Sequence, residues 1–553
     1  MLRAGIAAGL LLLGVSAGAE APVMPDLGAV EAMMRETGHL PLRGLAPPDP
    51  VVARLTWQKM PMAGVPAARR PIRDAIRAER LGEFDAARKA WAAIAADPKA
   101  SQPDREEALL AAVRLGVTHD PAAARAALAA VPPALRQGTG VRMLEARLLL
   151  MDGKYPDAVA LLSGEIPAAM RLGRIPAMQL MTELSMAAML AGDRSFAEQI
   201  AGWSGEALAS GLLQPALPRC SPEEELLPGD SAVVDVGLDI LGQLSRATPV
   251  WASRPGPMAE RLAARALDGN SNSAQMDLRS GTPLRILVQL ACAPHDIVPD
   301  PLMAASAFAE LGADGTPRQS EAMRTFLSAP RPTSPEQALA RLQDSALPLD
   351  VKTQMLAQAV TMMGDRPDSC GFAERLAGAG STLAFESRLA LAVALARCKS
   401  PEAAASQLKL AADDTTLPEA DRRAAAARAA GLTRDPALRA RMAAAALLPA
   451  DSCLLLDDLT LKGLVVEQED FPIGLRKQSV EGGMLTTFDR AASGATSAVR
   501  TMVGQPSLLF DDANRALLKR HTPLPPQRDG RAVACKGHVA SIRWQLQEPD
   551  QAE

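Results

Sequence analysis

The stretch that decides the fold class is residues 81–98, LGEFDAARKAWAAIAADP. Gly82 is a typical helix end, and the alanine-rich run after Phe84 favours a second helix, because alanine is the best helix former. Phe84 is expected to wedge between the two helices, and the small alanines after it let them pack closely. Asp97-Pro98 then ends the second helix. The segment therefore predicts a helix–turn–helix unit.

Residue pairs typical of a turn between two helices recur at a nearly constant spacing. They return after 34, 37 and 39 residues, and later at spacings of 34 and 35 residues: Leu115-Gly116, Gly153-Lys154, Gly192-Asp193, and then Gly364-Asp365, Cys398-Lys399, Thr433-Arg434. These spacings bracket the tetratricopeptide period, and residues 70–210 and 350–445 resemble that repeat family. Residues 211–345 are richer in proline and serine, and we expect irregular helical hairpins there, with helices at 257–267 and 301–311.

The body of the chain is therefore predicted to be mainly α, a TPR-like helical solenoid. Such arrays present an extended concave surface, which favours binding of a peptide or a partner protein. The alternative is that the array is only a structural spacer.

Composition and charge exclude several classes of protein. Of 553 residues 107 are alanine, which supports a helical body. The net charge of −4 provides no basic face for the phosphates of a nucleic acid. Aromatic residues make up 3% of the chain, and Tyr155 is its single tyrosine, so stacking platforms for bases or sugars are scarce.

The first 19 residues have the pattern of a secretory signal peptide. Arg3 forms the positive region, residues 6–15 form the apolar run, and Ala17-Gly18-Ala19 fits the small-x-small cleavage rule. The apolar run is half of the ~20 residues that a membrane-spanning helix needs. We expect a mature chain that starts at Glu20, lies in the periplasm and has no integral membrane span.

Six cysteines fit an oxidising compartment: Cys220, Cys292, Cys370, Cys398, Cys453 and Cys535. Stacked repeats bring Cys370 and Cys398 to neighbouring turn edges, so we expect these two to pair. Cys453 and Cys535 flank a small C-terminal domain and are expected to staple it. Cys220 and Cys292 then remain for the third disulfide.

That small domain is marked by a change in composition. Alanine is absent between Ala450 and Ala491, where strand-forming residues replace helix formers, so we place a boundary near residues 446–468. Beyond it the pattern predicts strands and one amphipathic helix, in the order strand 484–488, turn at Gly494, strand 495–503, helix after Pro506 and strand 539–546.

The order and spacing resemble the TonB C-terminal domain family over residues 470–547. The residues that carry the resemblance are Phe471, Pro472, Glu481, Gly482, Phe488, Asp489, Gly494, Pro506 and Phe510. The resemblance implies that the last strand receives an extended peptide of an outer-membrane transporter, or of another envelope protein, by β-augmentation. The alternative is that residues 454–466 or the helical array already cover this edge.

Alternation along the last strand selects the candidate partner-binding residues. Ile542 and Trp544 are expected on the face toward the helix. Ser541, Arg543 and Gln545 are then outward and free to meet a partner.

No arrangement of residues points to catalysis. The H-E-x-x-H, Walker and G-x-S-x-G motifs are absent. Ser406 and Lys409 spell S-x-x-K without its companion motifs, and Gly229-Asp230-Ser231 lacks a downstream Asp-x-x-His. We therefore expect no catalytic, cofactor-binding or metal-binding residues.

The predicted layout is a signal peptide (1–19), a helical segment (20–69), a TPR-like helical repeat region (70–450), a linker or strand segment (451–469), the TonB-like domain (470–547) and a tail (548–553). We expect a non-enzymatic periplasmic adaptor that binds envelope proteins. The alternatives are a structural scaffold of the envelope with no role in TonB-dependent uptake, and an unrecognised periplasmic enzyme.

Overall fold

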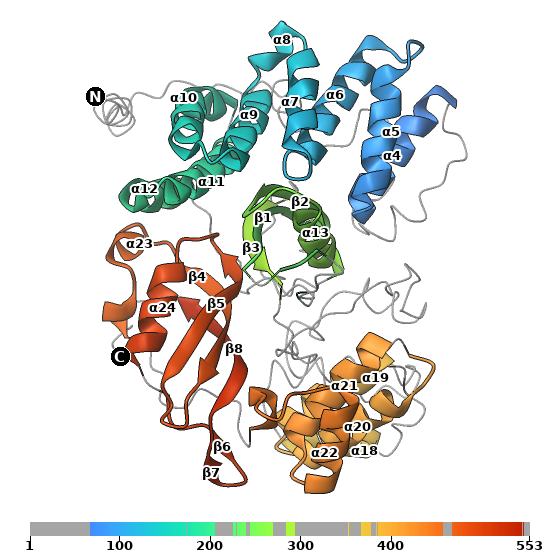
Figure 1. Cartoon of the computed structure of the whole chain (residues 1–553), viewed down its shortest axis with the longest axis vertical. Helices are drawn as coiled ribbons and strands as arrows, with labels where there is room; N and C mark the ends of the chain where they lie inside the picture. The colour runs from blue at the N-terminus through green and yellow to red at the C-terminus, as the bar shows by residue number, and fades with distance from the viewer. Residues whose placement is uncertain are drawn as a thin grey trace.

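The computed structural model describes residues 67–204, 220, 225–238, 244–268, 284–292, 352, 367–377, 383, 385–456 and 467–546, except residues 173, 228, 418, 522 and 545. This part of the chain forms two groups of helices, a six-stranded sheet and a two-stranded ribbon (Figure 1). The signal peptide and the helix expected at 301–311 lie outside the described residues.

The first group of helices follows the chain in a row. Its members are α4 (Arg70–Leu81), α5 (Phe84–Ala96), α6 (Gln102–Gly116), α7 (Pro121–Ala130), α8 (Pro133–Arg136), α9 (Thr139–Met151), α10 (Tyr155–Leu172), α11 (Arg174–Leu190) and α12 (Arg194–Ser204), after the 3-10 turn η1 (Ala67–Arg69). Apart from the one-turn α8, each helix packs against the next. The glycines expected to end helices do so: Gly82, Gly153 and Gly192 have left-handed φ values of 78°, 71° and 80°, which glycine adopts without steric cost.

Two buried ion pairs connect alternate helices of this row. Arg114 of α6 donates to both carboxylate oxygens of Glu79 in α4, at 3.0 and 2.8 Å. Arg147 of α9 likewise donates to both oxygens of Glu183 in α11, with its Nε at 3.0 Å. Each ion pair therefore fixes the relative position of two helices that are separated in sequence by one other helix, α5 in the first case and α10 in the second.

The second group also packs in chain order. It comprises α18 (Pro367–Ala377), α19 (Phe385–Arg397), α20 (Pro401–Asp413), α21 (Glu419–Leu432) and α22 (Pro436–Ala445). Proline begins α18, α20 and α22, as the sequence indicates, since proline lacks the N–H that the first helical turn leaves unpaired. The prediction of a mainly helical chain with a C-terminal antiparallel sheet is confirmed at this level.

The sheet corrects the prediction of helical hairpins in residues 211–345. Its strands are β1 (Ser231–Leu238), β2 (Leu244–Ala252), β3 (Leu284–Ala291), β4 (Gly482–Arg490), β5 (Thr496–Gln505) and β8 (Cys535–Trp544), in the order β2-β1-β3-β5-β4-β8. Between β2 and β3, α13 (Met258–Asp268) does match the expected helix. The apolar runs of β1 and β3 are short, and periodicity alone cannot distinguish a buried strand from a buried helix.

The C-terminal strands are also not a separate small sheet. The expected strands are present in β4, β5 and β8, with α24 (Asp511–Arg520) between the last two. However, β5 pairs with β3, so the sheet continues into residues 231–291. The sheet therefore crosses the predicted limits of 70–450 and 470–547.

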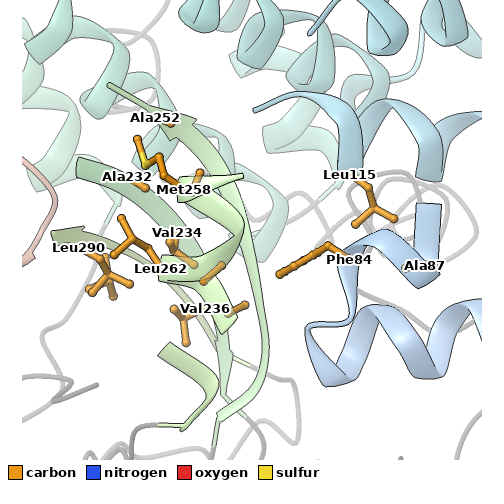
Figure 2. Close-up of a cluster of buried hydrophobic side chains, with 14 of the residues drawn as sticks. Phe84, Ala87, Leu115, Ala232, Val234, Val236, Ala252, Met258, Leu262 and Leu290 are labelled. Carbon is orange, nitrogen blue, oxygen red and sulfur yellow. The ribbon is translucent and has the colours of Figure 1, made fainter. Parts of the chain in front are cut away.

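The first helical group curves around β1, β2, β3 and α13 (Figure 1). Val233, Val250 and Leu287 bury one face of the sheet against residues of α9–α11. On the other face, Val234 and Val236 pack with Leu262 of α13, and Phe84 reaches toward them from α5 (Figure 2). The inner side of the row, where we expected a partner to bind, thus packs against the chain's own sheet.

Short elements complete the C-terminal part: η4 (Cys453–Leu455), η5 (Gln468–Asp470), α23 (Ile473–Lys477), β6 (Gln527–Arg528) and β7 (Arg531–Ala532). Residues 453–455, expected as part of a strand or linker segment, form a 3-10 turn instead. Residues 457–466 of that segment lie outside the described ranges.

The disulfides are Cys220–Cys292, Cys370–Cys398 and Cys453–Cys535, the pairs expected from the sequence. Three disulfides indicate an oxidising compartment. Within the described ranges, no helix combines the length and apolar composition needed to cross a bilayer.

Candidate peptide-binding edge

The strand β8 is the last one of the sheet. It pairs with β4 from Gly482↔Trp544 to Arg490↔Cys535. On its other side, the described residues contribute a single bridge, from Ser452 to Lys536. The predicted final strand is confirmed, although it begins at Cys535 rather than at Val539. Residues 538–544 therefore have no strand partner on the outer side within the described part of the chain.

Side chains alternate along this strand as predicted. Ile542 and Trp544 are 4% and 0% exposed, and both belong to the core that contains Phe510 and Leu517 of the adjacent helical segment. Ser541 and Arg543 are exposed. Gln545, the third predicted partner-binding residue, lies outside the described residues.

An aromatic cluster holds the inner face of β8. The Trp544 ring stacks on Phe510 with a centroid distance of 5.5 Å. Phe471 meets both rings edge-on, each at 5.8 Å. Gly482 of β4 permits this packing, because a Cβ there would lie 2.3 Å from Cε2 of Phe510. Phe471, Gly482 and Phe510, three of the residues that carry the TonB-like resemblance, thus pack together beneath β8.

Both ends of β8 are tied to neighbouring segments. At its start, Cys535 is bonded to Cys453, and the Lys536 N–H donates to the Asp451 carbonyl at 2.8 Å. Just past its end, the Leu546 N–H donates to the Glu481 carboxylate at 2.9 Å. These contacts hold both ends of β8 in place, and the middle of the strand lies between them.

His538 is a buried polar residue within this strand. It is 2% exposed, its ring centroid lies 5.1 Å from that of Phe488, and neither ring nitrogen has a hydrogen-bond partner among the described residues. Burial, followed by the positive charge of Arg490, lowers the pKa of His538 to about 3. The imidazole is therefore neutral at physiological pH.

The residues considered for catalysis have structural partners. Ser406 donates to the Glu402 carbonyl at 2.9 Å, and Lys409 lies 2.9 Å from Asp413. Asp230 accepts two hydrogen bonds from Arg254, at 2.9 and 2.7 Å. These contacts do not bring the three candidates together into one site.

Among the described residues, two carboxylates and a histidine lie close enough together to coordinate a metal ion. Oxygen and nitrogen atoms of Glu467, Asp470 and His521 lie within 4.8 Å of one another. Asp470 already accepts a hydrogen bond from Arg520, and it lies 2.8 Å from the His521 Nε2 atom. The guanidinium group of Arg520 thus supplies the positive charge that the buried carboxylate requires.

Sequence reasoning missed the polar contacts where the two halves of the sheet meet. Gln289 of β3 contacts Asp511 and Leu508 of the C-terminal half, although more than 200 positions separate them. The apolar run around Gln289, LRILVQLA (Leu284–Ala291), indicates a buried segment, but its periodicity does not distinguish a strand from a helix.

No protein-family model, curated protein or solved structure matches this chain.

Proposed function

We propose that this chain is an exported, non-enzymatic adaptor that binds an extended peptide of an envelope protein along the outer edge of β8. The observation that carries the proposal is the position of β8 at the end of the sheet, with Ser541 and Arg543 exposed. A terminal strand has main-chain N–H and C=O groups that can pair with an incoming strand.

The order of elements in residues 482–544 supports this choice. It is strand, strand, helix and strand, the order expected from the resemblance to the TonB C-terminal domain family. That resemblance makes an N-terminal peptide of an outer-membrane transporter the first partner to test. Arg543 adds a chemical preference, since its exposed guanidinium group favours a carboxylate on the bound peptide.

Export is supported by the three disulfides, which form in oxidising compartments. N-terminal sequencing of the mature protein should begin at or near Glu20. Recovery of an intact Met1 from the inner-membrane fraction would instead indicate a retained anchor and would contradict this part of the proposal.

The binding proposal is tested by site-specific photo-crosslinking in the full-length, oxidised protein. A photoreactive phenylalanine derivative at position 541 should crosslink to a peptide of an envelope protein, whereas the same group at the exposed Leu447 should not. Arg543→Pro, which removes a main-chain donor, should abolish the crosslink. Arg543→Ala keeps the main-chain N–H and should retain most of it.

Two results would contradict the proposal. One is a crosslink from position 541 to residues 454–466 of the same chain, which would show that the edge is covered internally. The other is capture that persists in Arg543→Pro while circular dichroism shows the variant to be folded. If Arg543→Pro fails to fold, amide exchange of the wild-type protein is measured with and without candidate peptides. The proposal then requires that a peptide protects residues 538–544 from exchange.

A structural scaffold is the second candidate, and one observation favours it. The first helical group packs its inner side against β1–β3 and α13, so this part of the chain uses its binding surface internally. A scaffold without a docked peptide would give no crosslink from position 541.

A further inference from the structure

The two halves of the sheet have the same order of elements. In the N-terminal half, β1 and β2 form a hairpin, α13 follows, and β3 pairs with β1. In the C-terminal half, β4 and β5 form a hairpin, α24 follows, and β8 pairs with β4. The strand orders β2-β1-β3 and β5-β4-β8 are therefore equivalent.

The connections agree in length as well. Five residues join the hairpin strands in each half, 239–243 and 491–495, and five residues join hairpin to helix, 253–257 and 506–510. The return to the third strand takes 15 residues in one half, 269–283, and 14 in the other, 521–534.

Both hairpins also contain two register shifts, at similar distances from the residues that join their strands. In the first hairpin the shifts fall at Val233/Val234 and Gly237/Leu238. In the second they fall at Leu485/Thr486 and between Thr487 and Asp489. Bulges are built-in features of a fold, so their matching positions support a common origin of the two units.

The two units meet edge to edge, and one is turned over relative to the other. Their contact is the antiparallel pairing of Gln289 with Gly504 and of Leu290 with Val503. Leu290 and Val503 share the core of α13, whereas Met484, the partner of Gly504 in β4, belongs to the core of α24. Side chains alternate across a sheet, so the two helices lie on opposite faces.

We propose that residues 229–292 are a second copy of the module formed by residues 482–544, and that the edge of its third strand, β3, is a strand-docking edge occupied within the chain by β5 and latched by Gln289. This inference concerns β3, the equivalent of β8, and it holds whether or not β8 binds a partner.

The latch is a set of buried polar contacts. Gln289, 6% exposed, donates from Nε2 to Asp511 Oδ2 at 3.1 Å, and its Oε1 accepts from the Leu508 N–H at 3.1 Å. Thr501 donates to the other oxygen of Asp511 at 3.0 Å. Gly504 leaves room for this arrangement, because a Cβ there would lie 3.0 Å from the Gln289 Oε1 atom.

The latch is needed because the backbone contact is short. β3 pairs with β1 over all eight of its residues but with β5 over two. The junction is therefore the weakest lateral contact of β3. The occupant that this edge fits is an antiparallel strand with glycine opposite Gln289, and β5 meets that description.

Hydrogen–deuterium exchange of the full-length, oxidised protein tests the proposal. Gln289→Leu keeps the size of the side chain but removes both latch bonds. Amide exchange around Leu290 and residues 503–504 should accelerate on the order of tenfold or more, as expected for two lost hydrogen bonds. The pairings β1–β2 and β4–β8 should keep their protection.

Two further variants make the outcome decisive. Gln407→Leu removes a different buried glutamine, whose Nε2 donates to the Ala377 carbonyl at 3.0 Å in the second helical group, and it should leave the junction unchanged. Gly504→Ala should open the junction by crowding Gln289. Unchanged exchange at the junction in Gln289→Leu would overturn the proposal, and so would simultaneous loss of protection throughout both units.

Discussion

At the scale of single residues, Trp544 supports the inner face of β8. It has no exposed surface and packs against Phe471 and Phe510. Trp544→Ala should therefore lower the free energy of unfolding by ~3–5 kcal/mol, the range for removal of a large buried aromatic ring. Urea unfolding of the oxidised protein measures this loss. Arg543→Ala is the matched control at an exposed position and should change stability by no more than about 0.5 kcal/mol. A similar loss in both variants would contradict the assignment of the two faces.

His538, in the same strand, should make stability depend on pH. Its pKa is lowered from 6.5 to about 3 by burial and by Arg490, so the folded protein keeps it neutral while the unfolded chain takes up a proton below pH 6.5. Its contribution to stability is complete above that pH and declines as pH falls toward 3, by about 1.4 kcal/mol per pH unit at most.

His538→Gln cannot take up this proton. Its unfolding free energy should decline less steeply than that of the wild type between about pH 6 and pH 4, as measured by urea titrations at several pH values. Parallel pH profiles of the two proteins would show that His538 is not held neutral by the fold.

At the scale of elements, Arg147 joins two helices to the sheet. It is fully buried, donates to Glu183 of α11, and lies 3.7 Å from Asp235 of β1. Arg147→Met should cost about 3–5 kcal/mol, because it leaves the buried Glu183 carboxylate without its guanidinium group. Arg142→Met on the same helix removes a partly exposed ion pair with Glu145 and should cost at most about 1 kcal/mol. Equal losses, measured by thermal or urea unfolding, would contradict the role of Arg147 as a buried connection.

At the scale of the whole molecule, a disulfide and several hydrogen bonds attach the second helical group to the C-terminal part of the sheet. The Cys453–Cys535 bond links the segment after α22 to the start of β8. Arg528, in the ribbon β6–β7, donates to the carbonyl groups of Ala450, Ser452 and Leu455 beside it. This junction fixes the start of the proposed binding edge.

Removing this disulfide should therefore destabilise the protein. The bonded cysteines are 82 residues apart, and the chain-entropy relation gives about 4–5 kcal/mol for the paired change Cys453→Ser and Cys535→Ser. Cys370→Ser with Cys398→Ser, across 28 residues, should cost less, about 3–4 kcal/mol. Chemical denaturation compares the two, and peptide mapping without reduction confirms the pairs. Free thiols or different partners in the mapping would refute the connectivity.

The sequence by itself determined the local features of this protein. Gly82, the prolines that begin helices, and the alternation of Ser541 and Arg543 with Ile542 and Trp544 each act through backbone geometry within a few residues, so their patterns are visible in the chain. The disulfide pairs could also be predicted from the sequence. The chain has six cysteines, and their positions relative to the expected helices and strands limited the possible pairings.

Only the tertiary structure decided that one sheet unites residues 231–291 with 482–544. The pairing of β3 with β5 uses main-chain groups, which every residue carries, so it leaves no pattern in the sequence. The buried run of β3 is compatible with a strand or a helix until its neighbours are known. Gln289 likewise resembles any polar residue until the fold places Asp511 and Leu508 beside it, which is why the junction and the second module emerged from the structure alone.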